Sequence, residues 1–573
     1  MPLSPLPQHA LDFMDWPWSQ MEPYYQELVA RPLNEANIAS WLADWSHLKK
    51  LVNETYARLQ LANSRDTANE QAERRYYSFL DHVYPSIQAA DQKLKEKLLT
   101  SGLTAPGFEI PLRNLRVEAA LFREANLPLL AEEHKLGSAY NKIVGAQTVQ
   151  WEGSETTAQQ LRLKAQTPDR ETRERVWRLL SARQLADREV VNALWVKFMS
   201  LRGQIAANAG FPEYRAYRWQ QQLRFDYTPA NCLQFHQAIE EVVVPAATRV
   251  YEKLRSRLAI DNIRPWDLDY ELYPMHFPPL KAYSTPKELE ERTAVIFQRV
   301  SPKVGAYFET MRREGLLDLE NRKGKAPGAF CTSFATLGQP FVFCNSVGLS
   351  NDVRTLLHEA GHAFHVFERS KLPYHHQWRT GMEFNEVASM AMELLAIPYL
   401  PASQGGFYSE ADARCAILEQ LENLLLFWPY MAIVDAFQHW VYVNHAAASQ
   451  PSNCDAKWVE LWQRFIPSVD WSGLHPELET GWHRKQHIHR TPFYYIEYGL
   501  AQLGAVQLWA NALQDQEGAV ESYLNALALG GTLPLPRLYE TAGARFAFDA
   551  ETLRAAVRLV ESKIKESEVA LMA

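Results

Sequence analysis

The stretch 355–365, TLLHEAGHAFH, limits the fold of this chain more than any other feature. His358 and His362 lie four residues apart among apolar residues, a spacing that on an α-helix puts both imidazoles on one face, about one turn apart. Two imidazoles in that arrangement can share one tetrahedral zinc ion. Glu359 follows the first histidine directly, where a carboxylate reaches the attacking water instead of the metal. The sequence therefore predicts a helix that needs a further ligand from elsewhere.

The competing interpretation is an ordinary amphipathic helix, because so short a motif also arises by chance. The apolar residues around it, such as Leu356, Leu357 and Phe364, place it on a regular helix face and favour the metal site. Gly361 has no side chain, so a backbone or a substrate can approach the helix closely beside His362. His365 either leans toward the metal or packs beneath it, and we expect packing.

The stretch 381–400, GMEFNEVASMAMELLAIPYL, offers the missing carboxylate. Glu383, Glu386 and Glu393 are the candidates. Glu386 opens an apolar run of small residues that can pack closely against the first helix, so we predict that it is the third ligand. Glu393 lies two turns further along the same face, which suits a residue that orients a ligand histidine. A solvated carboxylate is the alternative for each.

Helical periodicity dominates the rest of the chain and predicts a mainly α fold. Apolar residues recur at helical spacing over 32–63, 172–210 and 285–317. The stretch 326–350 departs from this pattern, being rich in β-branched and aromatic residues around a turn at 337–340. We expect a short hairpin there that runs into the histidine helix. The hairpin either binds an extended peptide as an additional strand or only supports the helix.

Charge and apolar patterning exclude several classes of protein. The net charge of −8 and the absence of a basic stripe argue against nucleic acid as a partner. The most apolar run, 424–443, contains Pro429, Asp435 and His439 and is too polar to span a bilayer. The N-terminus lacks the pattern of a signal peptide. Five cysteines without a C-x-x-C pair favour a reducing compartment, so we expect a cytoplasmic protein.

The histidines are concentrated late in the chain, since eleven of the seventeen lie at or after His358. We therefore expect an N-terminal helical region over 1–200 and a catalytic domain over 201–573 that contains the zinc site. Length alone allows two to four domains.

These motifs together resemble peptidase family M3, the zinc oligopeptidases that include thimet oligopeptidase, neurolysin and oligoendopeptidase F. The resemblance rests on HEAGHAFH, EFNEVASMAMELL, RPWDLDYE (264–271) and KQHIHRTPFYYIEYGLAQLGA (485–505). It covers about residues 200–560, and the oligoendopeptidase F branch with its PZ-peptidases is the most similar. The resemblance implies a two-lobed helical body with a small sheet, a deep cleft, one zinc ion per chain and short peptides as substrates.

The stretch HIHRTPFYYIEY supplies groups that can stabilise an oxyanion. In the family a histidine precedes a tyrosine pair three residues apart, and this match implies that His487, Tyr495 and Tyr498 act on substrate. His489 is the alternative donor, because the glycine-rich loop of thimet oligopeptidase is replaced here by HRTPF. Tyr494, like His489 and Glu393, is assigned to substrate binding or support. A buried aromatic helix with incidental histidines is the other interpretation.

These observations predict a zinc endopeptidase that cuts internal bonds of short peptides. A dipeptidyl carboxypeptidase or metallocarboxypeptidase is the nearest alternative and would need a cation such as Arg490 or Lys485 for the substrate's carboxylate. A peptide-binding protein without catalysis is the alternative of another class. Glu359 argues against it, because a structural metal site has no use for a base.

Overall fold

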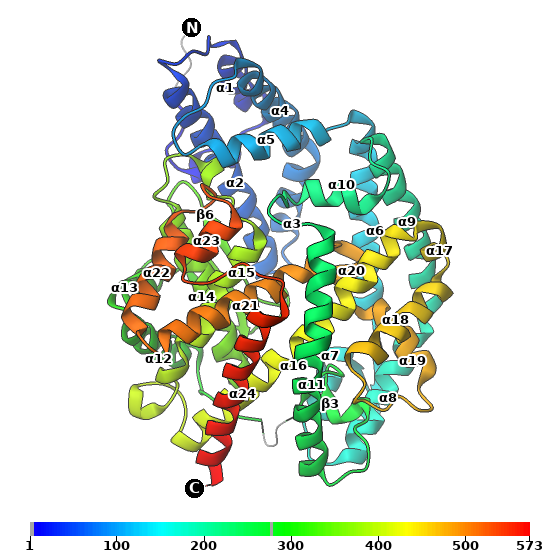
Figure 1. The fold of residues 1–573 in the computed structure, drawn as a ribbon. Coiled ribbons are helices and arrows are strands. Elements are labelled where there is room, and N and C mark those ends of the chain that lie inside the picture. Colours follow the sequence, from blue (N-terminus) through cyan, green and yellow to red (C-terminus); the bar gives the residue numbers. More distant parts are fainter. Residues whose placement is uncertain (1–4, 276–278, 573) are drawn as a thin grey trace. The chain divides into compact units, whose positions relative to one another are not determined.

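The structure, a computed structural model, describes residues 5–275 and 279–572, and most of them are helical (Figure 1). The chain divides into two compact units, each made of three separate stretches. The first unit contains Met1–Ala120, Lys281–Glu410 and Gly504–Phe546, and the second contains Leu121–Leu280, Ala411–Leu503 and Ala547–Ala573. The sequence analysis divided the chain at residue 200 into an N-terminal region and a catalytic domain. The two compact units do not test that division, so it stays a prediction.

The first unit combines helices with one three-stranded sheet. Its elements are α1 (Trp18–Ala30), α2 (Ile38–Arg65), α3 (Glu70–Ser78), α4 (Tyr84–Ser101), α5 (Glu109–Leu121, whose last residue falls in the second unit), α12 (Pro286–Val300), α13 (Pro302–Arg313), β5 (Leu317–Glu320), β6 (Phe330–Phe334), β7 (Gln339–Ser346), α14 (Ser350–Arg369), α15 (Met382–Leu395), α22 (Gln516–Ala528) and α23 (Leu535–Thr541). The helices predicted over 32–63 and 285–317 are confirmed as α2 and as the pair α12 and α13.

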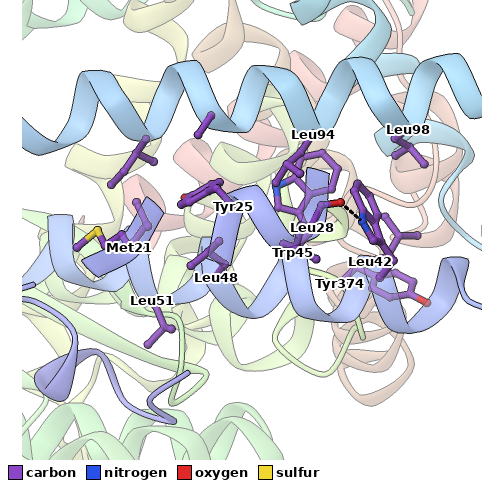
Figure 2. Close-up of a cluster of buried hydrophobic side chains, with 14 of the residues drawn as sticks. Met21, Tyr25, Leu28, Leu42, Trp45, Leu48, Leu51, Leu94, Leu98 and Tyr374 are labelled. Atoms are coloured by element: carbon purple, nitrogen blue, oxygen red, sulfur yellow. Dashed lines mark hydrogen bonds between the residues drawn. The ribbon is translucent and has the colours of Figure 1, made fainter. Parts of the chain in front are cut away.

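Apolar faces of α1, α2 and α4 meet in a core near the N-terminus (Figure 2). Leu28 of α1, Leu48 of α2 and Leu94 of α4 are buried there. The Trp41 indole N–H donates to the Leu28 carbonyl at 2.9 Å, so the polar end of this large apolar side chain keeps a partner. Helical spacing of apolar residues thus produces the packing that the sequence predicts.

The sheet leads directly into the histidine helix. β6 and β7 form the predicted antiparallel hairpin, with Phe334 opposite Gln339. Gly338 in the turn between them has φ +63°, a conformation that favours glycine. β5, which the sequence analysis missed, is a short strand parallel to β7, so the order is β5-β7-β6 and β6 is an edge.

Asp352 fixes where α14 begins. Its Oδ2 accepts hydrogen bonds from the backbone N–H groups of Val347, Gly348 and Leu349 at 2.8–2.9 Å. The Tyr283 hydroxyl donates to the same oxygen at 2.6 Å. A carboxylate near the first turn satisfies backbone donors and favours the positive end of the helix. The histidines therefore start at a fixed distance from the sheet.

The second unit is almost entirely helical. Its elements are α6 (Leu127–Gly145), β1 (Thr148–Trp151), β2 (Ser154–Thr157), α7 (Ala158–Ala165), α8 (Arg170–Ala186), α9 (Arg188–Asn208), α10 (Tyr214–Gln221), α11 (Pro229–Leu258), β3 (Leu268–Asp269), β4 (Tyr273–Pro274), α16 (Glu410–Val443, whose first residue falls in the first unit), α17 (His445–Ala448), α18 (Pro451–Phe465), α19 (His475–Glu479), α20 (Gln486–Arg490), α21 (Tyr495–Ala512, which continues into the first unit from Gly504) and α24 (Ala550–Met572). The helical stretch predicted over 172–210 is confirmed as α8 and α9.

Long helices pack in pairs within this unit. α11 and α24 lie side by side (Figure 1), and Arg249 pairs with Glu561 at 2.6 Å on their exposed surface. α16 packs on the first half of α21, where the Trp428 indole donates to the Gly499 carbonyl at 3.0 Å. None of the helices within the described ranges has the length and hydropathy to cross a membrane, including α16 with its apolar run.

Candidate active site

α14 and α15 bring together the ligand set that the sequence predicts in the first unit. His358 and His362 lie one turn apart on α14, with ring centroids 5.0 Å apart. Glu386 of α15 has its Oε2 3.5 Å from His358 Nε2 and 3.7 Å from His362 Nε2. One donor atom from each of the three lies within 4.8 Å of the others. Two imidazoles and a carboxylate at this spacing suit a zinc site with three protein ligands and one open position.

Gly361 makes this convergence possible. A Cβ at this position would lie 2.4 Å from the Ala388 carbonyl oxygen and 2.6 Å from Ser389 Cα. The backbones of α14 and α15 therefore touch where any larger residue would separate them. The sequence analysis left open whether a backbone or a substrate approaches here, and the structure shows the backbone of α15.

Side chains around the ligands hold them in place. His358 Nδ1–H donates to Glu393 Oε1 at 2.7 Å, which orients the ring with its Nε2 toward Glu386. The Ser389 hydroxyl lies 3.2 Å from Glu386 Oε2 and donates to the Glu386 carbonyl at 3.0 Å. Tyr523 of α22 donates to the Ala388 carbonyl at 2.8 Å. The sequence analysis missed Ser389 and Tyr523, because no local pattern links them to the motif.

The two histidines differ in protonation in the absence of a metal. Burial lowers the pKa of His362 to about 4, so its imidazole is neutral at neutral pH and carries a lone pair. Burial also opposes protonation of His358, yet hydrogen bonds to Glu386 and Glu393 hold its pKa well above the usual value. A metal ion at Nε2 would replace that proton in the same field of carboxylates. About a quarter of each histidine side chain is exposed (24% and 22%), so a substrate can reach the ligands.

Glu359 lies beside the ligands and against β6. Burial raises its pKa to about 7, and the neighbouring His358 opposes that shift. A hydrogen bond from the backbone of Cys331 in β6 favours its ionised form. A divalent cation on the adjacent histidines would lower this pKa, because positive charge stabilises the carboxylate. The pKa of Glu359 therefore depends both on its burial and on the charge beside it.

His365 points away from this ligand set. It is 1% exposed, and its ring contacts Phe384 edge-on at 6.2 Å. Burial lowers its pKa well below the usual value. It does not belong to the group of donor atoms that converge at the metal position. The structure therefore agrees with packing rather than coordination.

The second unit groups His487 of α20 with the three tyrosines that follow this helix. The ring of His487 lies 5.0 Å from Tyr495 and 6.2 Å from Tyr498, and it stacks on Tyr494 at 6.0 Å. Tyr495 and Tyr498 lie one turn apart at the start of α21, with centroids 5.7 Å apart. The structure thus gathers all four of these predicted residues into one cluster.

Lys485 is bound to this cluster. Its amine donates to the Tyr495 hydroxyl at 2.6 Å and lies 4.0 Å from the Tyr495 ring and 5.0 Å from the Tyr430 ring. Burial lowers its pKa to about 7, so half of the amines are neutral near that pH. The sequence analysis considered Lys485 only as a cation for a carboxylate and missed its bond to Tyr495.

His489 lies elsewhere in the same unit. Its side chain is 0% exposed and stacks on Tyr140 at 4.4 Å and on Trp482 at 5.7 Å. Arg202 donates to its backbone carbonyl. A histidine sealed among aromatic rings has no path to a substrate, whereas His487 is half-buried. Of the two alternatives, His487 has the more accessible side chain.

The segment between the histidines and α21 is tightly held. Phe493 adopts φ +66° without being glycine, and its side chain is fully buried. Its N–H donates to Gln438 Oε1 at 2.7 Å, and its carbonyl accepts from Arg224. Arg224 also pairs with Glu497 at 2.6 Å, both buried. These contacts hold Phe493 in its strained conformation. The segment is therefore fixed, whereas a glycine-rich loop at this place would be mobile.

Comparisons with known proteins agree with this fold and motif. The model of "Peptidase family M3" matches residues 163–558. "Oligopeptidase PepF" of Bacillus subtilis (strain 168) is 23% identical over 310 residues, which is 53% of this chain but only 45% of that relative. The structure titled "PZ PEPTIDASE A with inhibitor 2" superposes with a TM-score of 0.86 at 25% identity, covering 97% of this chain and 99% of that one. A structure described as a putative oligoendopeptidase F gives a TM-score of 0.85 at 25% identity, covering 96% of both chains.

A helical fold with an H-E-x-x-H helix and a carboxylate on the next helix defines a metallopeptidase. The matched residues extend well beyond that motif and take in most of both units. The chain belongs to peptidase family M3. The predicted resemblance to the oligoendopeptidase F and PZ-peptidase branch is confirmed by these relatives.

Proposed function

We propose that this protein is a zinc-dependent endopeptidase that hydrolyses internal bonds of short oligopeptides in the cytoplasm. The observation that carries the proposal is the convergence of His358, His362 and Glu386, with Glu359 beside them. Membership of family M3 and the likeness to oligopeptidases support the substrate class. The five cysteines, all within the described ranges and none in a disulfide, support a reducing compartment.

His358, His362 and Glu386 fit zinc by their chemistry as well as their spacing. Two neutral nitrogen donors and one carboxylate are the ligand set of catalytic zinc sites, which keep one position open. The bond from His358 to Glu393 is the support that such ligands need. When bound, zinc supplies a Lewis acid that makes water more acidic and polarises the scissile carbonyl.

In this proposal Glu359 is the general base. Its carboxylate takes a proton from the attacking water and later passes it to the leaving amine, so one residue serves both proton transfers. The backbone of Cys331 orients it through a hydrogen bond. Because β6 is an edge strand of the sheet and lies against Glu359, an extended peptide can add to it as a further strand and present its bond to Glu359.

We further propose that His487 and Tyr498 donate hydrogen bonds to the oxyanion and that Tyr495 positions the substrate. The half-buried state of His487 supports it over His489 as the donor. The bond from Lys485 fixes the Tyr495 hydroxyl, which suits a positioning group. Preorganised donors of this kind act mainly on the transition state.

The experiment that tests the main proposal is cleavage of an internally quenched peptide of about ten residues, amidated at its C-terminus. The protein as purified, the protein stripped with a chelator and the stripped protein restored with zinc are compared. We expect internal cleavage that is lost and then regained, because the metal supplies the Lewis acid. Cleavage only after a free C-terminus is provided would indicate an exopeptidase. Binding of the peptide without cleavage in any state would indicate a binding protein.

Tyr498→Phe tests the role of the tyrosine cluster. Loss of a donor to the oxyanion is expected to lower kcat by roughly 10²–10³-fold with little change in KM. Tyr77→Phe, at an exposed position on α3, is the matched control and is expected to change neither. A rise in KM at unchanged kcat would make Tyr498 a ground-state binding group.

A further inference from the structure

A second group of metal-binding side chains lies buried in the second unit, on helices that the proposed reaction does not use. Cys232 and His236 come from α11, and Asp435 and His439 come from α16. None of the four is more than 3% exposed. One donor atom each from Cys232, Asp435 and His439 lies within 4.8 Å of the others.

Both helices present their pair at the same spacing. Cys232 and His236 are four residues apart, as are Asp435 and His439, so each helix directs two donors from one face. His236 Nε2 lies 2.9 Å from Asp435 Oδ2, and His439 Nε2 lies 3.3 Å from the same oxygen. Donor atoms of Cys232, Asp435 and His439 therefore converge between α11 and α16, and His236 lies against the same carboxylate.

One polar atom at this position, Asp435 Oδ1, is sealed from solvent and has no hydrogen bond among the described residues. His439 Nε2 is sealed as well and has only its 3.3 Å contact with Asp435 Oδ2. Buried polar atoms without a partner are rare in native proteins and need an explanation, such as an ion that satisfies them. This observation is independent of the spacing and points to the same place.

We propose that Cys232, His236, Asp435 and His439 bind a structural zinc ion that ties α11 to α16. One thiolate, one carboxylate and two imidazoles form a closed tetrahedral set, which is typical of structural zinc and leaves no position for a substrate. The thiolate disfavours magnesium and calcium, which take oxygen ligands. The two negative ligands balance the charge of the ion, so the burial of the whole group is electrostatically neutral.

Arg215 is the one group that opposes this binding. Its NH1 lies 3.3 Å from His439 Nδ1, and an arginine only donates. Coordination through Nε2 leaves the proton on Nδ1, so the contact of Arg215 NH1 with His439 is lost. Glu213 Oε1 already accepts from its Nε at 3.0 Å and pairs with its NH2 at 2.9 Å. Binding of the ion therefore costs this 3.3 Å contact, while the two contacts of Arg215 with Glu213 remain.

The first test measures metal content in the purified full chain. We expect about two zinc ions per chain in the wild type and about one in His362→Ala, which removes only the α14 centre. One zinc in the wild type and none in His362→Ala would overturn the buried site while leaving the proposed active site intact. One zinc that survives His362→Ala but not Asp435→Ala would instead overturn the catalytic metal and uphold the buried one.

The second test identifies the ligand by its spectrum. His362→Ala reconstituted with cobalt is expected to show a thiolate-to-cobalt charge-transfer band, since only the buried set contains sulfur. Adding Cys232→Ser should abolish the band, whereas Cys415→Ser, at a half-buried position on α16, should leave it unchanged. Circular dichroism checks that the variants fold. A missing band in His362→Ala, or a band that survives Cys232→Ser in folded protein, would overturn the assignment.

Discussion

The helix pairs α14–α15 and α11–α16 each direct histidine and carboxylate side chains at one point, but they differ in exposure and in their neighbours. On α14, His358 and His362 are partly open to solvent and Glu359 lies beside them. On α16, Asp435 and His439 are sealed, and the residues that follow them are Ala436 and Trp440. A neighbouring base and access to solvent suit the α14–α15 group to catalysis, whereas the sealed α11–α16 group suits only a structural role.

The largest expected effect comes from Glu359→Gln. Loss of the general base should lower kcat by about 10²–10⁴-fold, since the attacking water keeps its proton. Metal content should stay that of the wild type, because Glu359 is no ligand. Peptide kinetics and metal analysis on one sample check both. Substantial remaining turnover would mean that Glu359 is not the base, and that a base does not distinguish the α14–α15 group from the α11–α16 group.

Glu393→Ala should weaken the open centre without removing a ligand. His358 loses the acceptor that fixes its ring, and the expected cost is about 10–100-fold in zinc affinity. Titration of stripped protein against a zinc buffer measures it, with activity restored at high zinc. Glu314→Ala, at an exposed carboxylate after α13, serves as the control and should bind zinc as the wild type does.

Gly361→Ala tests the close approach of α14 and α15. The added Cβ meets the Ala388 carbonyl, so we expect a loss of about 1–3 kcal/mol in the free energy of unfolding and weaker zinc binding. Gly145→Ala is the matched control, because it also lies in a helix but has open space around it. Denaturant unfolding compares the two. Equal stability of both variants would mean that the helices need not touch.

The smallest expected effect is that of Ser389→Ala. Its hydroxyl supports Glu386, and loss of this bond should cost about 0.5–1.5 kcal/mol in stability and only a few-fold in zinc affinity. The same zinc titration measures it beside Glu393→Ala. A larger loss of zinc affinity in Ser389→Ala than in Glu393→Ala would mean that Ser389 supports the site more strongly than Glu393, contrary to the distances.

Local patterns were enough to predict much of the candidate site. The i, i+4 spacing of His358 and His362 specifies one helix face, and the apolar run after Glu386 specifies another. The β6–β7 hairpin follows from its composition and its turn at Gly338. These features depend on residues close in sequence, so their physical cause can be read without the rest of the chain.

Contacts between distant residues could not be predicted in this way. The choice of His487 over His489 depends on Tyr140 and Trp482, which enclose His489. The strained conformation of Phe493 depends on Arg224, 269 positions away. Nothing in the periodicity of one helix specifies which side chains of another helix will cover it.

The sequence by itself determined the helices, the hairpin, the family and the residue types that can bind a metal. Only the tertiary structure decided which of those residues meet. Glycine at position 361 permits the contact of α14 with α15, but the contact itself depends on both helices and their packing. Cys232 and Asp435, 203 positions apart (435 − 232), meet only because α11 packs on α16. Spacing along a chain sets direction on a helix, whereas the burial of apolar faces sets which helices come together.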